Sequence, residues 1–272
     1  MGFAWPVGDA PSRVTLRQVG GPVFVECQAW GANPGSGAPT VLLLHEGLGS
    51  VALWRRFPAA LAQATGWGVL AWSRAGHGFS NARRSPWSAD YLQQEADSAV
   101  APVLDAFGID RAVLLGHSDG GSVAAAYAGG PGRADPRLVG LVLMAPHFFT
   151  EPEQLAAIRD TGQRYRAGGL RTRLVGYHRD VDTLFSGWHG AWTDPDFAVG
   201  DLQVRLPGIR LPMLALQGAD DAYGSTRQLE VLAACAGRVD THLLDACGHH
   251  PHLEHPDLTG ALIARFLTEC AS

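Results

Sequence analysis

Lysine is absent from this chain, and all 21 of its basic residues are arginines. A chain without lysine offers no Schiff-base nucleophile and no anchor for pyridoxal phosphate, so both chemistries are excluded. A phosphate-binding loop of the G-x-x-x-x-G-K-[ST] type is excluded for the same reason. The arginine-, alanine- and glycine-rich composition indicates a bacterial source.

The chain is also poor in charge, in cysteine and in long apolar runs. Its 21 basic and 26 acidic residues give a net charge of −5, which argues against a nucleic-acid partner. Four scattered cysteines without C-x-x-C spacing are expected to be free thiols. No apolar run reaches the roughly 18 residues of a membrane span, and residues 1–13 show no secretory signal. We therefore expect a cytoplasmic protein without a membrane partner.

Short apolar runs alternate with longer helical patterns along most of the chain. Helix-length segments at 89–107, 120–128, 226–236 and 258–268 separate the runs, so the connections between strands are crossovers. Several runs are apolar on both faces, which is typical of buried parallel strands. The pattern predicts a mostly parallel α/β sheet that is covered on both sides. The predicted strands are 23–29, 41–44, 69–72, 112–115, 138–144, 213–216 and 241–244.

One segment, residues 147–206, breaks this alternation with consecutive helical patterns and no clear strand. It predicts a helical cap inserted into a core domain made of residues 1–146 and 207–272. The cap holds 8 of the 23 aromatic residues of the chain. An apolar lid must bury either the core or a ligand. From it we expect four residues to contact the substrate: His147, Phe148, Trp188 and Trp192.

The strongest functional signal is the G-x-S-x-G sequence Gly116-His117-Ser118-Asp119-Gly120. It directly follows a predicted strand and directly precedes a helical pattern. A serine on such a turn is held in a strained conformation with its hydroxyl exposed, and the flanking glycines allow close packing around it. The helix N-terminus behind the turn favours developing negative charge. This context predicts that Ser118 is a nucleophile.

Together with this motif, four further segments resemble the α/β-hydrolase superfamily. They are LLLHEGLGS at 42–50, SRAGHGFS at 73–80, QGADD at 217–221 and CGHHPHLE at 247–254. In that superfamily a histidine-glycine turn follows the third strand, an acid follows the sixth or seventh strand, and a histidine follows the last. The resemblance covers nearly the whole chain apart from the cap, and it implies an α/β-hydrolase fold.

A serine nucleophile needs a neutral histidine to take its proton and a carboxylate to orient that histidine. The superfamily order of nucleophile, acid and base implies His249 as the base. The acid slot after strand 138–144 holds no carboxylate, so the slot after strand 213–216 must serve. There the G-x-x-D spacing selects Asp221 over Asp220, which we expect to order the following turn.

The oxyanion hole is expected to consist of backbone N–H groups. The resemblance implies one donor from Asp119, directly after the nucleophile, and another from Gly47. In this loop Glu46 replaces the usual glycine of the superfamily. An ionised Glu46 aimed at the oxyanion would oppose catalysis. Glu46 therefore makes structural hydrogen bonds, is protonated, or binds a cationic or hydroxyl group of the substrate.

The histidines at 249, 250, 252 and 255 could also be interpreted as metal ligands. Pro251 and Pro256 break the helical i, i+4 spacing, and no thiolate pair accompanies the histidines, so we expect no metal. No G-x-G-x-x-G follows the first strand, which argues against a dinucleotide, and we expect no cofactor. Cys247 lies on no strand-to-helix turn and is interpreted as a packing residue.

The resemblance implies a serine hydrolase of the carboxylesterase type, acting on a small to medium hydrophobic substrate through an acyl-enzyme. The same triad serves lactonases, thioesterases, amidases and hydrolases that cleave C–C bonds of ring-cleavage products. The sequence motifs are common to all of these hydrolases. A weakly catalytic ligand receptor on the same fold, and an acyltransferase or perhydrolase, are alternatives of other classes.

Overall fold

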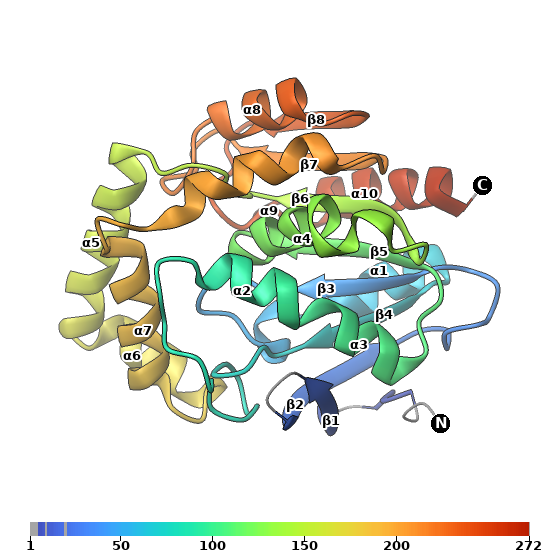
Figure 1. Ribbon diagram of the computed structural model, residues 1–272, viewed down its shortest axis with the longest axis horizontal. Helices are drawn as coiled ribbons and strands as arrows, with labels where there is room; N and C mark the ends of the chain where they lie inside the picture. The colour runs from blue at the N-terminus through green and yellow to red at the C-terminus, as the bar shows by residue number, and fades with distance from the viewer. Residues whose placement is uncertain (1–4, 9, 19–20, 272) are drawn as a thin grey trace.

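A single eight-stranded sheet forms the centre of the protein in the computed structural model, which describes residues 5–8, 10–18 and 21–271 (Figure 1). The strand order is β1-β2-β4-β3-β5-β6-β7-β8. β2 is antiparallel to both of its neighbours, and β3 to β8 pair in parallel. The strands are β1 (Ser12–Gln18), β2 (Gly21–Trp30), β3 (Thr40–Leu44), β4 (Gly68–Trp72), β5 (Ala112–His117), β6 (Leu138–Met144), β7 (Met213–Gly218) and β8 (Val239–Leu244).

The mostly parallel sheet predicted from the apolar runs is confirmed, and the structure adds β1. This strand alternates buried Val14 and Leu16 with exposed Arg13 and Arg17. Only one face of an edge strand needs to be apolar, so β1 lacks the continuous apolar run that indicates the others.

Helices cover both faces of the sheet (Figure 1). Alternate side chains of β3 enter two separate cores, with Leu42 and Leu44 in one and Val41 and Leu43 in the other. The first core packs against α2 (Tyr91–Ser98), α3 (Val100–Phe107), α4 (Asp119–Gly129) and α8 (Arg227–Cys235). The second packs against α1 (Phe57–Thr65) and α10 (Pro256–Ala271). Shorter helices are η1 (Val51–Trp54), η2 (Pro131–Ala134) and α9 (Pro251–Glu254).

The helix predicted over 89–107 is interrupted, and α2 and α3 meet at Ala99. Pro102 lies in the first turn of α3. Because proline has no N–H, it cannot donate to the carbonyl of Ser98, four residues earlier, as a continuous helix requires. Pro102 therefore explains why the helix is interrupted.

Three helices between β6 and β7 lie together beside one end of the sheet (Figure 1). They are α5 (Pro152–Arg166), α6 (Gly169–Leu174) and α7 (Val181–Thr193), with η3 (Val175–Tyr177) between the last two, and we refer to them as the cap helices. The predicted cap limits of 147–206 also include most of η4 (Ala198–Gly208), whose Leu202 and Leu206 are buried in the first core. None of the described helices is long and apolar enough to cross a membrane.

Candidate active site

Ser118 occupies the turn between β5 and α4, with φ 54° and ψ −120°. A positive φ is strained for a residue with a side chain and is typical of functional turns. A methyl group at Gly120 would collide with the carbonyl of Leu44, and one at Gly116 with the backbone of Gly120. Glycine at both positions therefore lets the turn approach the end of β3, which presents the serine hydroxyl above the sheet.

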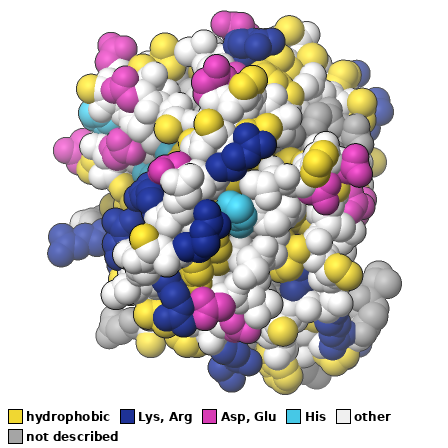
Figure 2. Space-filling model, turned by 90° about the vertical axis from the view of Figure 1, so that its left-hand side faces the viewer, with side chains coloured by type: hydrophobic (Ala, Val, Ile, Leu, Met, Phe, Trp, Pro, Cys, Tyr) yellow, Lys and Arg dark blue, Asp and Glu magenta, His cyan; other side chains and the backbone are white. Residues whose placement is uncertain are grey.

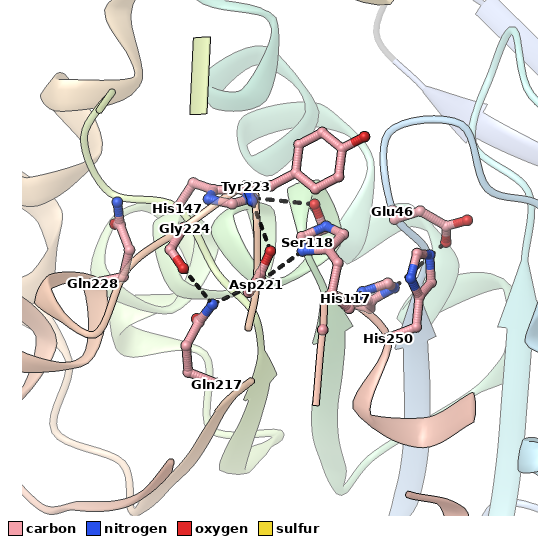
Figure 3. Close-up of polar contacts among 12 residues, drawn as sticks. Glu46, His117, Ser118, His147, Gln217, Asp221, Tyr223, Gly224, Gln228 and His250 are labelled. Atoms are coloured by element: carbon pink, nitrogen blue, oxygen red, sulfur yellow. Dashed lines mark hydrogen bonds and ion pairs between the residues drawn. The ribbon is translucent and has the colours of Figure 1, made fainter. Parts of the chain in front are cut away.

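Asp221, after β7, pairs with His249, after β8: His249 Nδ1 lies 2.8 Å from Asp221 Oδ2. Gln217 Nε2 donates to the same oxygen at 2.6 Å, and the Tyr223 N–H donates to Oδ1 at 2.8 Å (Figure 3). Burial alone would raise the pKa of Asp221, but the charge and hydrogen bond of His249 and the Tyr223 N–H outweigh burial and lower it. The carboxylate is therefore ionised and accepts a hydrogen bond from His249 Nδ1–H.

The neighbouring Asp220 does not order the following turn, although this was expected from the sequence. Its side chain is exposed at the cavity rim, and the turn is ordered instead by Asp221, whose Oδ1 accepts from Tyr223 N–H. Asp221 can both pair with His249 and order the turn because each of its two oxygens has a different partner.

The loop that carries His249 is fixed from both sides. The Glu254 carboxylate accepts hydrogen bonds from the N–H groups of Gly248, at 2.7 Å, and His250, at 2.8 Å. His117 Nε2 donates to the carbonyl of His249 at 2.7 Å. The residue before the nucleophile thus ties the turn of Ser118 to the loop of His249.

The hydroxyl of Ser118 meets His147 rather than His249 in this structure. Ser118 Oγ lies 3.3 Å from His147 Nε2, and this is the hydrogen bond that the hydroxyl makes among the described residues. The rings of His147 and His249 stack with centroids 5.7 Å apart. Burial, followed by the charge of His249, lowers the pKa of His147 to about 3. Hydrogen bonds of catalytic groups commonly tighten only when substrate is present.

Gly47 and Asp119 face the same cavity as Ser118. Asp119 is the first residue of α4, so its N–H has no partner within the helix. Its carboxylate is turned aside and accepts from the hydroxyl of Tyr91, which in turn accepts from Trp192 Nε1 at 2.9 Å. The two predicted oxyanion donors are thus backbone groups on one wall of the cavity.

Glu46 lines the cavity, but its carboxylate points away from Ser118, on the side of His250 (Figure 3). Oε2 lies 3.7 Å from His117 Nδ1, and the side chain is 22% exposed. Burial opposes ionisation, yet the nearby imidazoles of His117, His45 and His250 outweigh it and lower the pKa of Glu46. This arrangement favours the structural interpretation of Glu46 and argues against a protonated carboxyl group.

A cavity of about 480 Å³ lies between the sheet and the cap helices. Phe148 does not belong to its lining: the side chain is fully buried in the first core, and its N–H donates to Gln228 Oε1. The expectation that Phe148 contacts the substrate is therefore wrong. The cap helices contribute five apolar side chains, from Ile158, Leu170, Leu174, Trp188 and Trp192, and four polar ones, from Gln154, Thr161, Arg164 and Arg173.

The cap segment carries several exposed arginines, and two of them line the cavity. Figure 2 shows this side of the molecule, with basic side chains spread across it. Six exposed arginines lie within the cap segment, and Arg164 and Arg173 line the cavity itself. The six are Arg159, Arg164, Arg166, Arg171, Arg173 and Arg179.

Comparisons with known proteins agree with this architecture. The sequence pattern of the alpha/beta hydrolase fold family matches residues 39–175. A 2-hydroxymuconate semialdehyde hydrolase from Pseudomonas sp. (strain CF600) is 25% identical over 87% of this chain and 89% of the relative. A thermophilic esterase from Thermogutta terrifontis superposes with a TM-score of 0.70 at 21% identity, over 96% of this chain and all of that one. The enol-lactonase from Burkholderia xenovorans LB400 superposes with a TM-score of 0.69 at 23% identity, over 90% and 97% of the two chains.

Proposed function

This chain belongs to the alpha/beta hydrolase fold family, and we propose that it is a serine hydrolase that cleaves a carboxylic ester of a small to medium hydrophobic substrate. The observation that carries the proposal is Asp221 Oδ2 lying 2.8 Å from Nδ1 of His249, whose side chain lines the same cavity as Ser118 on its strained turn. An ionised aspartate on Nδ1 leaves Nε2 of the ring as the proton acceptor that a serine nucleophile needs.

In the proposed reaction Ser118 Oγ forms a bond to the ester carbonyl carbon while its proton passes to His249 Nε2. Asp221 stabilises the resulting imidazolium, and the N–H groups of Gly47 and Asp119 receive the negatively charged oxygen. The C–O bond to the alcohol then breaks, and the alcohol leaves with the proton from His249. Water attacks the acyl carbon, transfers a proton to His249, and releases the acid as Ser118 Oγ regains its proton.

Hydrolysis of a C–C bond is the second candidate. It is favoured by the similarity to the 2-hydroxymuconate semialdehyde hydrolase, whose match extends over 87% of this chain. The same nucleophile, base and acid would serve this reaction, because the triad does not determine which bond is broken.

Kinetics on the purified full chain test both candidates. The substrates are p-nitrophenyl esters from acetate to octanoate and, in parallel, 2-hydroxymuconate semialdehyde. Ser118→Ala is compared with Ser98→Ala, a matched change on an exposed part of α2. We expect Ser118→Ala to lower kcat by a factor of at least 10³, as loss of a triad nucleophile does, and Ser98→Ala to act like the wild type.

The preferred substrate distinguishes the two candidates. Turnover of the esters with no turnover of the semialdehyde supports ester hydrolysis, and the reverse supports C–C hydrolysis. A folded wild-type protein that hydrolyses neither, or an activity that survives Ser118→Ala, contradicts the proposed function.

A further inference from the structure

The ring proton of His147 is placed by a chain of hydrogen bonds that begins in the cap. At the start of α5 the Glu151 N–H donates to Gln154 Oε1 at 3.2 Å, as part of a capping box. This contact orients the Gln154 amide, so that Nε2 faces His147 Nδ1 at 3.0 Å. An amide nitrogen only donates, so His147 Nδ1 accepts and the ring proton lies on Nε2. His147 is therefore a hydrogen-bond donor toward Ser118.

Both ends of this series of hydrogen bonds are held by residues outside the cap helices. The Glu151 carboxylate accepts from Ser225 N–H at 3.0 Å, from Ser225 Oγ at 2.6 Å and from Gln228 Nε2 at 2.8 Å. The backbone of His147 is bound on α4, where its N–H donates to Ser122 Oγ at 2.9 Å and its carbonyl accepts from that hydroxyl at 2.8 Å. Neither the amide nor the ring can turn over without breaking buried hydrogen bonds.

Trp188 lines the same cavity and carries a second N–H group beside it. The residue is 7% exposed, and among the described residues its buried indole Nε1 has no hydrogen-bond partner. The indole packs against Gly47, where a methyl group would collide with it. A buried N–H without an acceptor carries a desolvation penalty. An acceptor atom on a bound ligand would remove that penalty.

The reaction would also deprive His147 of its acceptor. Once Ser118 Oγ has bonded to an acyl carbon, it is an ester oxygen and accepts hydrogen bonds weakly. A plain alkyl chain would then leave the N–H groups of His147 and Trp188 both buried and unpaired. A substrate with a further acceptor oxygen near the scissile carbonyl would satisfy them.

We propose that His147 and Trp188 are specificity-determining donors that select acyl substrates with a second acceptor oxygen, an oxo or carboxylate oxygen, within a few atoms of the scissile carbonyl. Gln154 is the positioning residue that holds His147 in the donating tautomer. This inference rests on the proposed serine hydrolase function and defines its substrate class.

The test compares ethyl 2-oxo-, 3-oxo- and 4-oxopentanoate with ethyl pentanoate. For each enzyme the preference is the ratio of kcat/KM on the best oxo ester to kcat/KM on the plain ester, so differences in intrinsic reactivity cancel between variants. Gln154→Glu keeps the acceptor for Glu151 N–H but replaces the donor that faces His147 with a carboxylate. The ring proton then moves to Nδ1, and Nε2 presents a lone pair to the substrate.

We expect Gln154→Glu and His147→Phe to lower the oxo preference at least tenfold, and Trp188→Phe to lower it less. Gln163→Glu, on the exposed side of the same helix, is the matched control and keeps the wild-type preference. In ¹⁵N spectra of the imidazole rings, His147 carries its proton on Nε2 in the wild type and on Nδ1 in Gln154→Glu. If Gln154 only filled space, Gln154→Glu would leave the ring proton of His147 on Nε2.

The outcomes separate this inference from the proposed function. Ester hydrolysis that depends on Ser118 while all variants keep the wild-type preference overturns the inference and leaves the proposed function standing. A wild-type His147 with its proton on Nδ1 also overturns it, whatever the kinetics. If the folded wild type hydrolyses p-nitrophenyl esters but none of the four ethyl esters, this inference falls and the proposed function stands. If it hydrolyses no ester of either series, the proposed ester hydrolysis falls as well. Where His147→Phe does not fold, Gln154→Glu decides.

Discussion

The sheet side and the cap side of the cavity are lined by different kinds of residues. On the sheet side, Ser118 directly follows β5, and Asp221 and His249 lie in the loops after β7 and β8. Hydrogen bonds from the Tyr223 N–H and from the His117 side chain fix the loops of Asp221 and His249. On the cap side, apolar side chains of α5, α6 and α7 form the wall, with Arg164 and Arg173 among the lining residues.

This difference indicates a division of labour. Groups that transfer protons must be held within a few tenths of an ångström, and strand ends of a buried sheet provide that rigidity. Apolar contacts tolerate changes of shape, so the cap can adapt to different substrates while the chemistry stays constant. Substitutions on the sheet side should therefore abolish turnover, and substitutions in the cap should change selectivity.

The largest effect after loss of the nucleophile is expected from Asp221→Asn. The amide has nearly the same shape but no charge, and its NH₂ group favours the wrong tautomer of His249. We expect kcat to fall by a factor of about 10⁴, as in other triads with this change, with KM changed less than tenfold. Steady-state kinetics on the best ester measure it. Asp220→Asn, on the exposed neighbour, is the matched control, and an equal loss in both variants would contradict the assignment of the acid.

A smaller effect is expected in the cap from Leu170→Trp, which fills part of the cavity wall. The larger ring should exclude long acyl chains, and each excluded methylene in an apolar pocket is worth roughly 10-fold or more in specificity. The ratio of kcat/KM for octanoate to that for acetate should fall at least tenfold. Leu258→Trp, at an exposed leucine of α10, should leave this ratio unchanged. A uniform loss on all esters would contradict the division of labour.

Buried histidines predict an acid-sensitive fold. Burial lowers the pKa of His45, His77, His147 and His252 below the ordinary value of about 6.5. Below that pH the unfolded chain binds protons that the folded chain does not, so the free energy of unfolding falls as pH decreases. Tm should fall progressively from pH 6.5 to 4.5, at constant ionic strength. A constant Tm over this range would show that these rings are protonated in the folded protein.

The smallest effect is expected from Glu46→Gln. The carboxylate faces His117 and not the nucleophile, so its charge contributes to stability more than to the reaction. We expect the free energy of unfolding to fall by about 1 kcal/mol and kcat/KM to fall less than tenfold. Chemical denaturation and ester kinetics measure the two quantities. A loss of kcat/KM beyond a hundredfold at normal stability would assign Glu46 to the substrate instead.

The sheet and the nucleophile turn could be predicted from the sequence because both depend on local patterns. Apolar runs indicate buried strands, and glycines beside Ser118 indicate a turn in close contact with β3. The edge strand β1 and the interruption at Pro102 depend on neighbours and on a single missing N–H, which a count of apolar residues does not detect.

Other parts of the site depend on how separate elements pack. Phe148 and Trp188 are both aromatic residues of the predicted cap, yet one is buried in the core and the other lines the cavity. The contact of His147 with Gln154 depends on the direction in which α5 leaves β6, and the orientation of the amide depends on its capping box. The spacing of residues along the chain predicts neither which aromatic side chain lines the cavity nor how Gln154 contacts His147.

The contact of Trp188 with Gly47 joins the two sides of the cavity and constrains how this chain can evolve. A side chain at position 47 has no room while the indole occupies its place. A smaller residue at position 188 would open a gap beside the oxyanion loop, which position 47 could then fill. A substitution at either position is therefore tolerated only with a matching substitution at the other, and the two positions should co-vary among related sequences. Leu170, which lines the cavity, should vary with the substrate that each relative binds.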